Sequence, residues 1–354
     1  MQTEETHYFK GRGAQIRTRN RYHKHEYVTE HIEGLDEPLL SEVTTQLYYE
    51  HPKKVVNKIE SPDLGLSYSL NPYQGCEHGC VYCYARNAHE YWGFSAGTDF
   101  ESKIIVKENA PQLLQEFLTK RNYKPVVITL SGNTDCYQPI ERKLGITRRL
   151  LQVLNKYRNP VGFITKNTLI LRDIDILKEL AQDDLVAVHF SINSLNEELR
   201  RKLEPRTASY KNRLKAIEKL ASSGIPVSVM CAPIIPGLNS HEVNNVIKAA
   251  ADHGAINAGY TIVRLNGAIG GIFTDWVHKN FPDAAEKILN QIKSCHGGTL
   301  NDSNYGRRIS GEGEIASSIK QMFKVAKNKY MGGGKPFKYN MTAFNPTPDK
   351  LTLF

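Results

Sequence analysis

The chain reads Asn71-Pro-Tyr-Gln-Gly-Cys76-Glu-His-Gly-Cys80-Val-Tyr-Cys83-Tyr84, which spaces three cysteines in a C-x3-C-x2-C pattern. Three thiolates are one short of the four ligands that an iron–sulfur cube or a closed structural zinc site usually takes. A loop of this kind therefore leaves one metal position open to a ligand that is not protein.

The residues between the cysteines suit a loop around a small inorganic cluster. Gly75 and Gly79 permit backbone conformations that a side chain would disfavour. With six cysteines in 354 residues, this spacing is expected by chance in about one such chain in a thousand. The pattern therefore predicts a metal-binding loop.

The aromatic Tyr82 before the third cysteine completes a pattern that resembles the hallmark of the radical S-adenosylmethionine (radical SAM) enzymes. The resemblance implies that Cys76, Cys80 and Cys83 hold a [4Fe–4S] cluster whose open iron binds S-adenosylmethionine. It also implies that an external donor supplies an electron, which breaks a C–S bond and leaves a 5′-deoxyadenosyl radical that takes hydrogen from a substrate.

Zinc is the alternative metal for this loop. His78, His89 or a distant cysteine would then supply the fourth ligand. The surrounding sequence offers no paired second half of a zinc site, so the iron–sulfur interpretation is preferred.

The middle of the chain alternates strand-like and helix-like patterns. Strands are predicted over 66–71, 125–131, 160–165, 185–192, 225–231 and 260–264, and helices over 81–91, 141–157, 173–182, 209–223 and 240–253. The strands are continuous apolar runs, which is typical of a buried parallel sheet. Six such units fall short of the eight that close a full barrel. We therefore predict an α/β fold, a partial (β/α)6 TIM-like barrel, which is also the core that the radical SAM resemblance implies.

Three parts of the chain are predicted. Residues 1–60 form a basic, polar N-terminal arm or subdomain, 61–275 the radical SAM core, and 276–354 a C-terminal helical extension with an extended tail. The chain has no apolar run of about eighteen residues, and its start lacks a secretory signal. A cytoplasmic protein without a membrane partner is expected, in a compartment that keeps thiols reduced.

The net charge of +9 is concentrated in two stretches. Residues 10–25 and 320–338 carry the basic side chains Lys10, Arg12, Arg17, Arg19, Arg21, Lys24, Lys320, Lys324, Lys327, Lys329, Lys335 and Lys338. Such stretches can contact nucleic-acid phosphates, and a solvated face with a loose arm is the alternative.

Polar residues follow the second predicted strand. Asn133, Thr134 and Asp135 lie where the resemblance places the amino group of S-adenosylmethionine, held largely by backbone carbonyls. An amino donor needs acceptors, which these residues supply. A capped turn before a helix would explain the same residues.

Other strand ends carry further candidates for the cofactor. Ser191 and Asn193 follow the fourth strand, where the family often binds ribose, and turn polarity is the alternative. Arg206 lies in a segment similar to one in proteins related to spore photoproduct lyase, and it could pair with the carboxylate of S-adenosylmethionine or lie at the surface. The stretch 232–239 resembles the loop on the adenine side.

Cys136 lies at a strand end that should open toward the active site. Spore photoproduct lyase uses a thiol to return hydrogen to a product radical, so Cys136 is the candidate hydrogen donor, with a buried core cysteine as the alternative. Cys231 is expected in the core and Cys295 has no predicted role. Lys166 and Tyr84 face substrate or serve structure.

The last residues, Asp349 to Phe354, look like the motif Q-L-x-L-F with which bacterial repair proteins bind the sliding clamp. Leucine and phenylalanine side chains at an extended end can fill apolar pockets. Lys350 stands where the motif has glutamine, and a tail folded onto its own domain is the alternative.

The whole chain resembles bacterial radical SAM proteins related to spore photoproduct lyase. The resemblance implies a lyase-like enzyme that cleaves S-adenosylmethionine and acts on a nucleic acid, as in DNA repair. RNA, a protein or a small metabolite is the alternative substrate. A non-catalytic nucleic-acid-binding protein with a metal or cluster is the alternative of another class.

Overall fold

The structure is a computed structural model that describes residues 11–16, 18, 20, 22, 44–332 and 337–348. Its main sheet has the strand order β10-β9-β8-β7-β6-β3-β2. The strands are β2 (Val56–Lys58), β3 (Tyr68–Leu70), β6 (Ile128–Leu130), β7 (Val161–Thr165), β8 (Val186–Ser191), β9 (Val227–Ile234) and β10 (Asn257–Ile262).

Strands β3 and β6 to β10 run parallel, and β2 is added antiparallel at the edge beside β3. These parallel strands stand in the sheet in their chain order, which is the winding of a barrel rather than of a doubly wound sheet. Because β10 and β3 do not pair with each other, the barrel is open. The predicted partial (β/α)6 barrel is confirmed.

One row of side chains runs through the barrel core. Leu70 is opposite Leu130, Leu130 opposite Phe163, Phe163 opposite Val188, and Val188 opposite Val227. All five side chains are fully buried. The continuous apolar runs predicted these strands because both sheet faces are covered.

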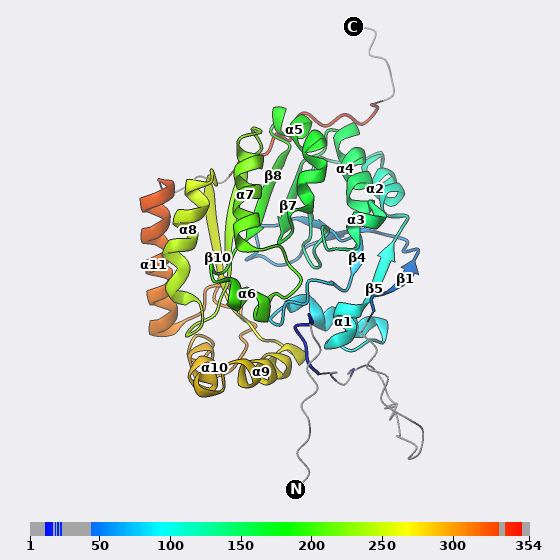
Figure 1. Cartoon of the computed structure of the whole chain (residues 1–354). Coiled ribbons are helices and arrows are strands. Elements are labelled where there is room, and N and C mark those ends of the chain that lie inside the picture. Colours follow the sequence, from blue (N-terminus) through cyan, green and yellow to red (C-terminus); the bar gives the residue numbers. More distant parts are fainter. Residues whose placement is uncertain are drawn as a thin grey trace, which may run out of the picture.

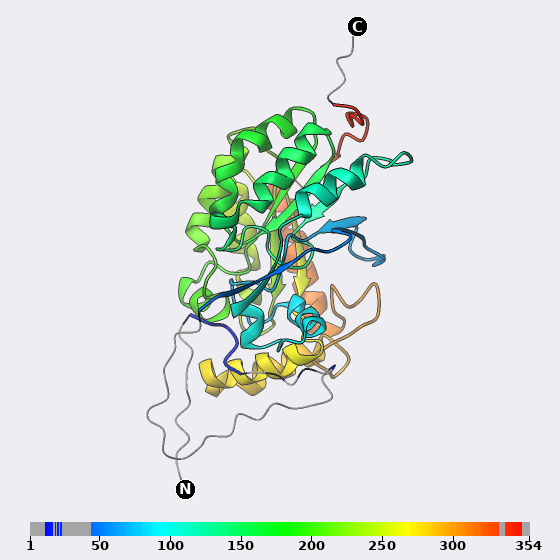
Figure 2. The same cartoon turned by 90° about the vertical axis from the view of Figure 1, so that its right-hand side faces the viewer.

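The helices that follow the strands lie on one side of the sheet, as Figures 1 and 2 show. They are α2 (Ala110–Leu118), α4 (Ile146–Lys156), α5 (Ile174–Gln182), α7 (Tyr210–Ala221), α8 (Val243–Asp252) and α11 (Gly313–Met331). Neighbours pack against each other, α2 on α4, α4 on α5, α7 on α8 and α8 on α11. None of the described helices is both long enough and apolar enough to cross a membrane.

Two predicted helices differ in the structure. The helix predicted over 141–157 is divided at Gly145, whose φ of 64° is left-handed, into α3 (Glu141–Leu144) and α4. The helix predicted over 81–91 is the 3-10 helix η1 (Tyr84–Trp92). Further short elements at the strand ends are η2 (Thr168–Asp173), α6 (Glu197–Leu203) and η3 (Ser240–Glu242).

A second, small sheet was not predicted. It has the order β1-β5-β4 and consists of β1 (Gln46–Glu50), β4 (Tyr73–Gln74) and β5 (Lys103–Lys107), with α1 (Thr98–Ser102) directly before β5. Strand β4 pairs antiparallel with β5. Because β4 begins the cysteine loop, this sheet anchors that loop to the segment around β5.

The C-terminal helices α9 (Ala268–Asn280) and α10 (Ala285–Ser294), joined by η4 (Pro282–Ala284), build a second core. Phe273 and Trp276 pack there with Val81 of the cysteine loop. Figure 2 shows these helices below the loop segment, and α9 contacts η1. The predicted domain boundary at residue 275 falls inside α9. The predicted clamp motif at 349–354 lies outside the described residues.

Candidate cluster and cofactor site

The cysteine loop is pressed against the segment of α1 and β5. Gly75 and Gly79 have positive φ angles of 79° and 67°. A Cβ on Gly75 would lie 2.8 Å from the carbonyl oxygen of Lys103, and one on Gly79 would lie 2.8 Å from Oε2 of Glu101. Both positions therefore need glycine for the backbone angle and for the close approach.

Side chains from the loop after β6 hold the cysteine loop from the other side. Nε2 of the buried Gln138 donates to the carbonyl of Gly75 at 3.1 Å, and its Oε1 accepts from the backbone N–H of Glu77 at 2.9 Å. The Glu77 carboxylate accepts from the N–H of Ile140 at 2.6 Å and from the Thr45 hydroxyl at 2.9 Å. These hydrogen bonds tie the cysteine loop to the segment after β6 and to Thr45.

Cys76 and Cys80 are each 6 % exposed, Cys83 is half-buried, and all three are free thiols. Burial raises the pKa of Cys76, and Asp135, Cys80 and Cys83 raise it further, so the three sulfurs lie within electrostatic reach of one another. Burial raises the pKa of Cys80 to about 12. Positively charged iron would favour the thiolate forms, and this donor set fits three corners of an iron–sulfur cube.

The two histidines considered as zinc ligands make other contacts in the structure. Nδ1 of His78 lies 3.4 Å from Oδ2 of Asp135, and Nε2 lies 3.2 Å from Nδ2 of Asn167. His89 packs against two phenylalanine rings at centroid distances of 5.3 and 5.5 Å. Within the described ranges, no three His, Cys, Asp or Glu side chains are grouped for one metal ion.

Tyr82 belongs to a buried polar network that sequence reasoning missed. Its hydroxyl donates to Glu204, whose Oε2 accepts from Nη2 of Arg213 at 2.6 Å. Nη1 of Arg213 donates to the carbonyl of Ser191 at 2.8 Å. Burial raises the pKa of Glu204, but Arg213 and Lys166 outweigh it and the pKa is lowered, so the carboxylate is charged. The network joins the cysteine loop to the end of β8.

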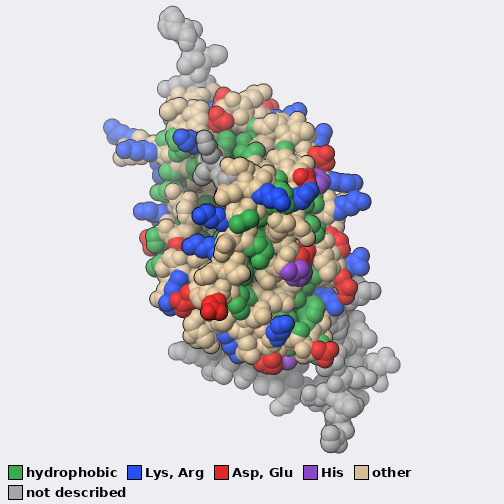
Figure 3. Space-filling view, turned by 90° about the vertical axis from the view of Figure 1, so that its left-hand side faces the viewer, with side chains coloured by type: hydrophobic (Ala, Val, Ile, Leu, Met, Phe, Trp, Pro, Cys, Tyr) green, Lys and Arg blue, Asp and Glu red, His purple; other side chains and the backbone are tan. Residues whose placement is uncertain are grey.

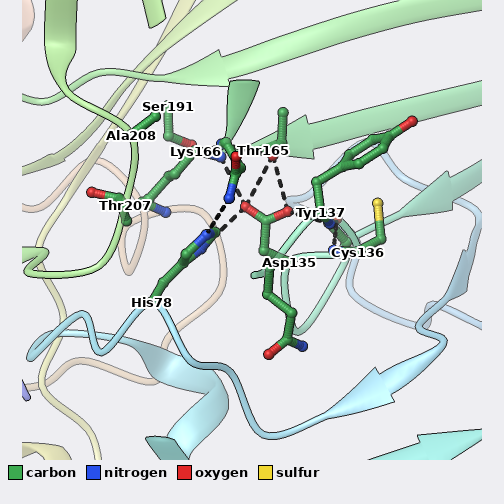
Figure 4. A network of polar contacts seen from close by, with 12 residues as sticks. His78, Asp135, Cys136, Tyr137, Thr165, Lys166, Ser191, Thr207 and Ala208 are labelled. Atoms are coloured by element: carbon green, nitrogen blue, oxygen red, sulfur yellow. Dashed lines mark hydrogen bonds and ion pairs between the residues drawn. The ribbon is translucent and has the colours of Figure 1, made fainter. Parts of the chain in front are cut away.

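Asp135 joins the ends of β6 and β7 (Figure 4). Its carboxylate accepts from the Thr165 hydroxyl at 2.9 and 3.0 Å, from the N–H of Lys166 at 2.8 Å and from the N–H of Tyr137 at 2.9 Å. With His78 at its other side, the carboxylate is held by protein donors. The predicted role toward the amino group of S-adenosylmethionine stays a prediction.

Asn133 and Thr134 lie beside the start of the cysteine loop. The Thr134 hydroxyl donates to the carbonyl of Tyr73 at 2.5 Å. The backbone N–H of Asn133 donates to Oδ1 of Asn71 at 2.9 Å, and its Nδ2 donates to Oε1 of Gln74 at 3.2 Å. The end of β6 and the cysteine loop are therefore in direct contact.

Asn193 carries an unused donor at the end of β8. The side chain is 2 % exposed, its Oδ1 accepts from the Tyr210 hydroxyl at 2.6 Å, and Nδ2 has no partner among the described residues. Nδ2 of Asn239 donates to the Asn193 carbonyl at 2.8 Å, which ties in the predicted adenine-side loop 232–239. Ser191 is buried beside them. Buried donors are mostly paired in native structures, so this amide N–H is available to a bound ligand.

Arg206 also lies against the cysteine loop. Its N–H donates to the carbonyl of His78 at 3.2 Å, and Nη2 lies 3.8 Å from Oε1 of Glu77. The guanidinium is one-third exposed and only loosely paired. It is therefore accessible to a ligand, as the sequence prediction requires.

Two residues without an assigned role lie near the thiols. Burial lowers the pKa of Lys166, but Cys80 and Glu204 outweigh it and the pKa is raised, so the ammonium stays charged. The Tyr84 hydroxyl donates to the carbonyl of Gly132 at 2.6 Å. Tyr84 thus links the third cysteine to the end of β6.

The other three cysteines lie in the main core. Cys136, Cys231 and Cys295 are at most 1 % exposed and belong to the same apolar cluster. In Figure 4 the sulfur of Cys136 points away from Asp135 and His78. This placement favours a core role for Cys136, and its role as hydrogen donor stays a prediction.

Together these elements define an α/β partial barrel with three free cysteine thiols in one loop at its strand ends. The family model of the Radical SAM superfamily matches residues 70–250. The chain belongs to the Radical SAM superfamily. It is therefore an enzyme of the type that uses a [4Fe–4S] cluster and S-adenosylmethionine, which decides against zinc.

The chain is similar to two uncharacterised proteins and to a radical SAM isomerase. The chain is 31% identical over 238 residues to an uncharacterised protein of Mycobacterium tuberculosis, covering 66% of this chain and 70% of the relative. It is 30% identical over 239 residues to an uncharacterised protein of Methanocaldococcus jannaschii, covering 68% and 85%. A radical SAM Nα-GlyT isomerase of Pseudomonas phage M6 is 26% identical over 172 residues, covering 48% and 34%.

Among solved structures, the fold is similar to that of spore photoproduct lyase complexed with dinucleoside spore photoproduct. The TM-score is 0.61 at 16% identity, with 86% of each chain covered. A mutant of the same enzyme with bound AdoMet and the dinucleoside gives 0.59 at 15% identity, with 88% of each chain covered. At this identity the likeness shows the fold.

Proposed function

We propose that the substrate of this radical SAM enzyme is a nucleic acid. The observation that carries the proposal is a pocket of about 380 Å³ among the loops that follow β6, β7 and α6. Arg142 and Arg206 line it with the polar side chains of Asn167, Thr168 and Asn212, and the described lining includes no Asp or Glu. Arginine is suited to phosphate oxygens, so the pocket fits a backbone phosphate.

The pocket adjoins the cysteine loop. Arg206 and Asn167 both contact His78, through the backbone N–H and the side-chain amide respectively. A phosphate held by Arg142 would therefore lie at the rim of the site where the radical is formed. Phosphate contacts position a nucleic acid without reading its sequence.

The solved spore photoproduct lyase supports DNA as the nucleic acid. That enzyme was solved with a dinucleoside spore photoproduct. We extend this ligand class to the present chain and infer a lyase-like repair reaction on a damaged base. Such a base must leave the stack to reach a buried site, which is cheapest for damaged or single-stranded DNA.

The cofactor roles are part of the proposal. Cys76, Cys80 and Cys83 would hold the cluster, which supplies the electron that cleaves S-adenosylmethionine once an external donor has reduced it. Tyr82 would shape the loop from its bond to Glu204.

The remaining strand ends would hold S-adenosylmethionine by complementary polarity. The groups proposed are Asn133, Thr134 and Asp135 with nearby carbonyls for the amino group, Ser191 and Asn193 for ribose, and Arg206 for the carboxylate. The unpartnered Nδ2 of the buried Asn193 supports the ribose role.

An isomerase is the second candidate. The relative from Pseudomonas phage M6 is named a radical SAM isomerase, and it matches 48% of this chain. Lyase and isomerase reactions share hydrogen abstraction from the substrate and differ in the fate of the substrate radical.

The two basic stretches support the proposal less than the pocket does. The Arg12 guanidinium is buried and donates to the carbonyl of Glu101 at 2.6 Å, and Lys327 donates to the carbonyl of Ala258 at 3.1 Å. Figure 3 shows the face around α8 and α11, where acidic side chains lie among the basic ones. Of the basic residues in these two stretches, those outside the described ranges are Lys10, Arg17, Arg19, Arg21, Lys24 and Lys335.

Binding of an oligonucleotide to Arg142→Gln tests the phosphate pocket. We expect weaker binding and a salt dependence whose slope falls by about one, because one phosphate contact is lost. Lys143→Gln removes the neighbouring exposed cation, which does not line the pocket, and should bind like wild type. Equal binding by wild type and Arg142→Gln would reject the pocket. Arg206 is left unchanged because it is also assigned to the cofactor.

The clamp motif adds a partner proposal that rests on sequence alone. Deleting residues 351–354 should leave cleavage of S-adenosylmethionine intact and abolish binding to the bacterial sliding clamp. Unchanged clamp binding, or none by the intact protein, would remove this proposal.

A further inference from the structure

Residues 11–16, called here the N-terminal strap, lie directly on the cysteine loop. A Cβ built on Gly13 would lie 1.6 Å from the carbonyl oxygen of Gly79 and 2.9 Å from Cγ1 of Val81. We propose that the strap closes over the cysteine loop, holds Cys80 in position through buried charges, and shields the cluster from solvent.

Glu101 is the centre of this arrangement. Its fully buried carboxylate accepts from the backbone N–H of Gly13 at 3.0 Å and from that of Ala14 at 2.7 Å. Its backbone carbonyl accepts from Nη1 of Arg12 at 2.6 Å. Hydrogen bonds to a buried charged group are stronger than neutral ones, so the strap is held firmly.

The same carboxylate is tied to a proposed cluster ligand. Nη2 of the buried Arg86 pairs with Oε1 of Glu101 at 2.5 Å, and Nε of Arg86 donates to the carbonyl of Cys80 at 2.9 Å. Nη1 donates to the carbonyls of Ala96 and Gly97 at 3.2 and 3.0 Å. The guanidinium is thus bonded on all three nitrogens, and a continuous path runs from the strap through Glu101 and Arg86 to Cys80.

Apolar packing fixes the strap on its other side. Ala14 is fully buried in a small cluster with Ala96 and with Ile272 of α9, and Ile16 and Ala268 pack against it. The strap therefore bridges the segment after η1 and the C-terminal helix α9. The strap and α9 both lie outside residues 70–250, the region that the family model covers, whereas the segment after η1 lies inside it.

Glu101, Arg86 and Gly13 are positioning residues in this scheme, because they act through Cys80. If the strap is displaced, Gly13 and Ala14 no longer satisfy Glu101, and the outer face of the loop at Gly79 becomes open to water. Removal of iron by a chelator should then become faster, although all three thiolates remain.

The test compares Gly13→Ala with Gly271→Ala in the full-length, cluster-loaded protein without oxygen. Gly271 lies on α9, and nothing lies within 4 Å of a Cβ added there. Gly271→Ala therefore adds the same methyl group without a steric clash. Losing the strap's bonds to a charged carboxylate should raise the rate of iron removal by a chelator about tenfold in Gly13→Ala. The visible absorption of the cluster at full loading should stay the same, and Gly271→Ala should match wild type.

Thermal unfolding of the same samples separates shielding from stability alone. A Gly13→Ala protein that melts earlier yet loses iron at the wild-type rate, far below its melting temperature, would overturn the proposal. Should Gly13→Ala not fold, Arg12→Ala carries the test, because it removes the bond from Arg12 to the carbonyl of Glu101 and adds no bulk. A wild-type rate in Arg12→Ala would equally count against the strap.

The inference rests on Cys80 as a cluster ligand, and Cys80→Ala tests that assignment separately. A Cys80→Ala protein that takes up a normal cluster would remove the assignment itself. Loss of the cluster in Cys80→Ala together with unchanged iron removal in Gly13→Ala would leave the ligands standing and reject only the strap.

Discussion

The hydroxyl of Tyr82 donates a hydrogen bond to Glu204, which lies 122 residues further along the chain and is fully buried. Tyr82 is the aromatic residue between the second and third cysteines, and Glu204 is paired with the equally buried Arg213. The geometry of the cysteine loop therefore depends on a charged pair at the far end of α6.

Tyr82→Phe removes this bond and keeps the ring. Because the acceptor is a buried carboxylate, we expect the free energy of unfolding to fall by about 1.5–3 kcal/mol. Tyr91→Phe is the matched control, since the Tyr91 residue is 70% exposed. Urea unfolding of both variants measures the difference, and equal stability of the two would show that the Tyr82 bond contributes nothing.

Glu204→Ala should destabilise the protein far more than loss of a surface carboxylate. It leaves the guanidinium of Arg213 buried without its partner, which typically costs about 3–5 kcal/mol. Glu198→Ala breaks a pair with Lys202 in which the carboxylate is 78% exposed, and such pairs contribute about 0–1 kcal/mol.

Chemical unfolding measures the loss in the free energy of unfolding for Glu204→Ala and for Glu198→Ala. A loss below about 1 kcal/mol in Glu204→Ala would mean that Arg213 finds another acceptor, since that is the range of an exposed pair. Nη2 of Arg213 would have to find this acceptor, because the carbonyls of Ser191 and Ala208 already accept from Nη1 and Nε.

The barrel was predictable because its strands are buried on both faces. The run 185–192 is mostly apolar, and the structure has β8 there. Strand β1 was missed because its side chains are exposed or half-exposed, so no apolar pattern marks it. The division of the helix over 141–157 depends on the left-handed backbone of Gly145, and a single glycine in a helical pattern is a weak signal.

The site was predictable only where its signal is local. The cysteine spacing is contained in a few residues, whereas Glu101 meets Gly13 across 88 positions and Tyr82 meets Glu204 across 122. A buried glutamate also has no mark that distinguishes it from a solvated one in sequence, since burial is set by tertiary contacts. The described structure alone therefore identifies the charged partners of the loop.

Replacing any one of Cys76, Cys80 and Cys83 by alanine should abolish the cluster and the formation of 5′-deoxyadenosine from S-adenosylmethionine. Each removes one of only three thiolates, and no other cysteine lies outside the core. Under anaerobic conditions, visible absorption measures the cluster and chromatography measures the 5′-deoxyadenosine formed. A variant that keeps normal cleavage would exclude the mutated residue as a ligand.

Cys136→Ala should keep both the cluster and the cleavage of S-adenosylmethionine. Its thiol is fully buried in the main core, so the expected cost is a loss of packing, about 1 kcal/mol for a small buried group. A variant of normal stability that forms the radical but no longer completes turnover on DNA would instead favour the hydrogen-donor role.

The protein should become less stable in mild acid because its His89 is buried. The ring is fully buried beside two phenylalanine rings, and burial lowers the pKa of His89 to about 4. Between that value and the usual 6.5 the unfolded chain binds the proton and the folded chain does not, so stability falls as pH falls through this window. The full loss is on the order of 3 kcal/mol.

His89→Phe isolates this contribution, because a phenyl ring suits a site already lined by two phenylalanines. The difference in the free energy of unfolding between the variant and wild type should grow in favour of the variant as the pH is lowered from 7 to 4.5. The two proteins are compared at equal cluster loading, so that the acid sensitivity of the cluster cancels in the difference. The contribution of His78, whose pKa is also lowered by burial, cancels in the same way. A constant difference across this pH range would mean that the His89 ring becomes protonated without opening the fold.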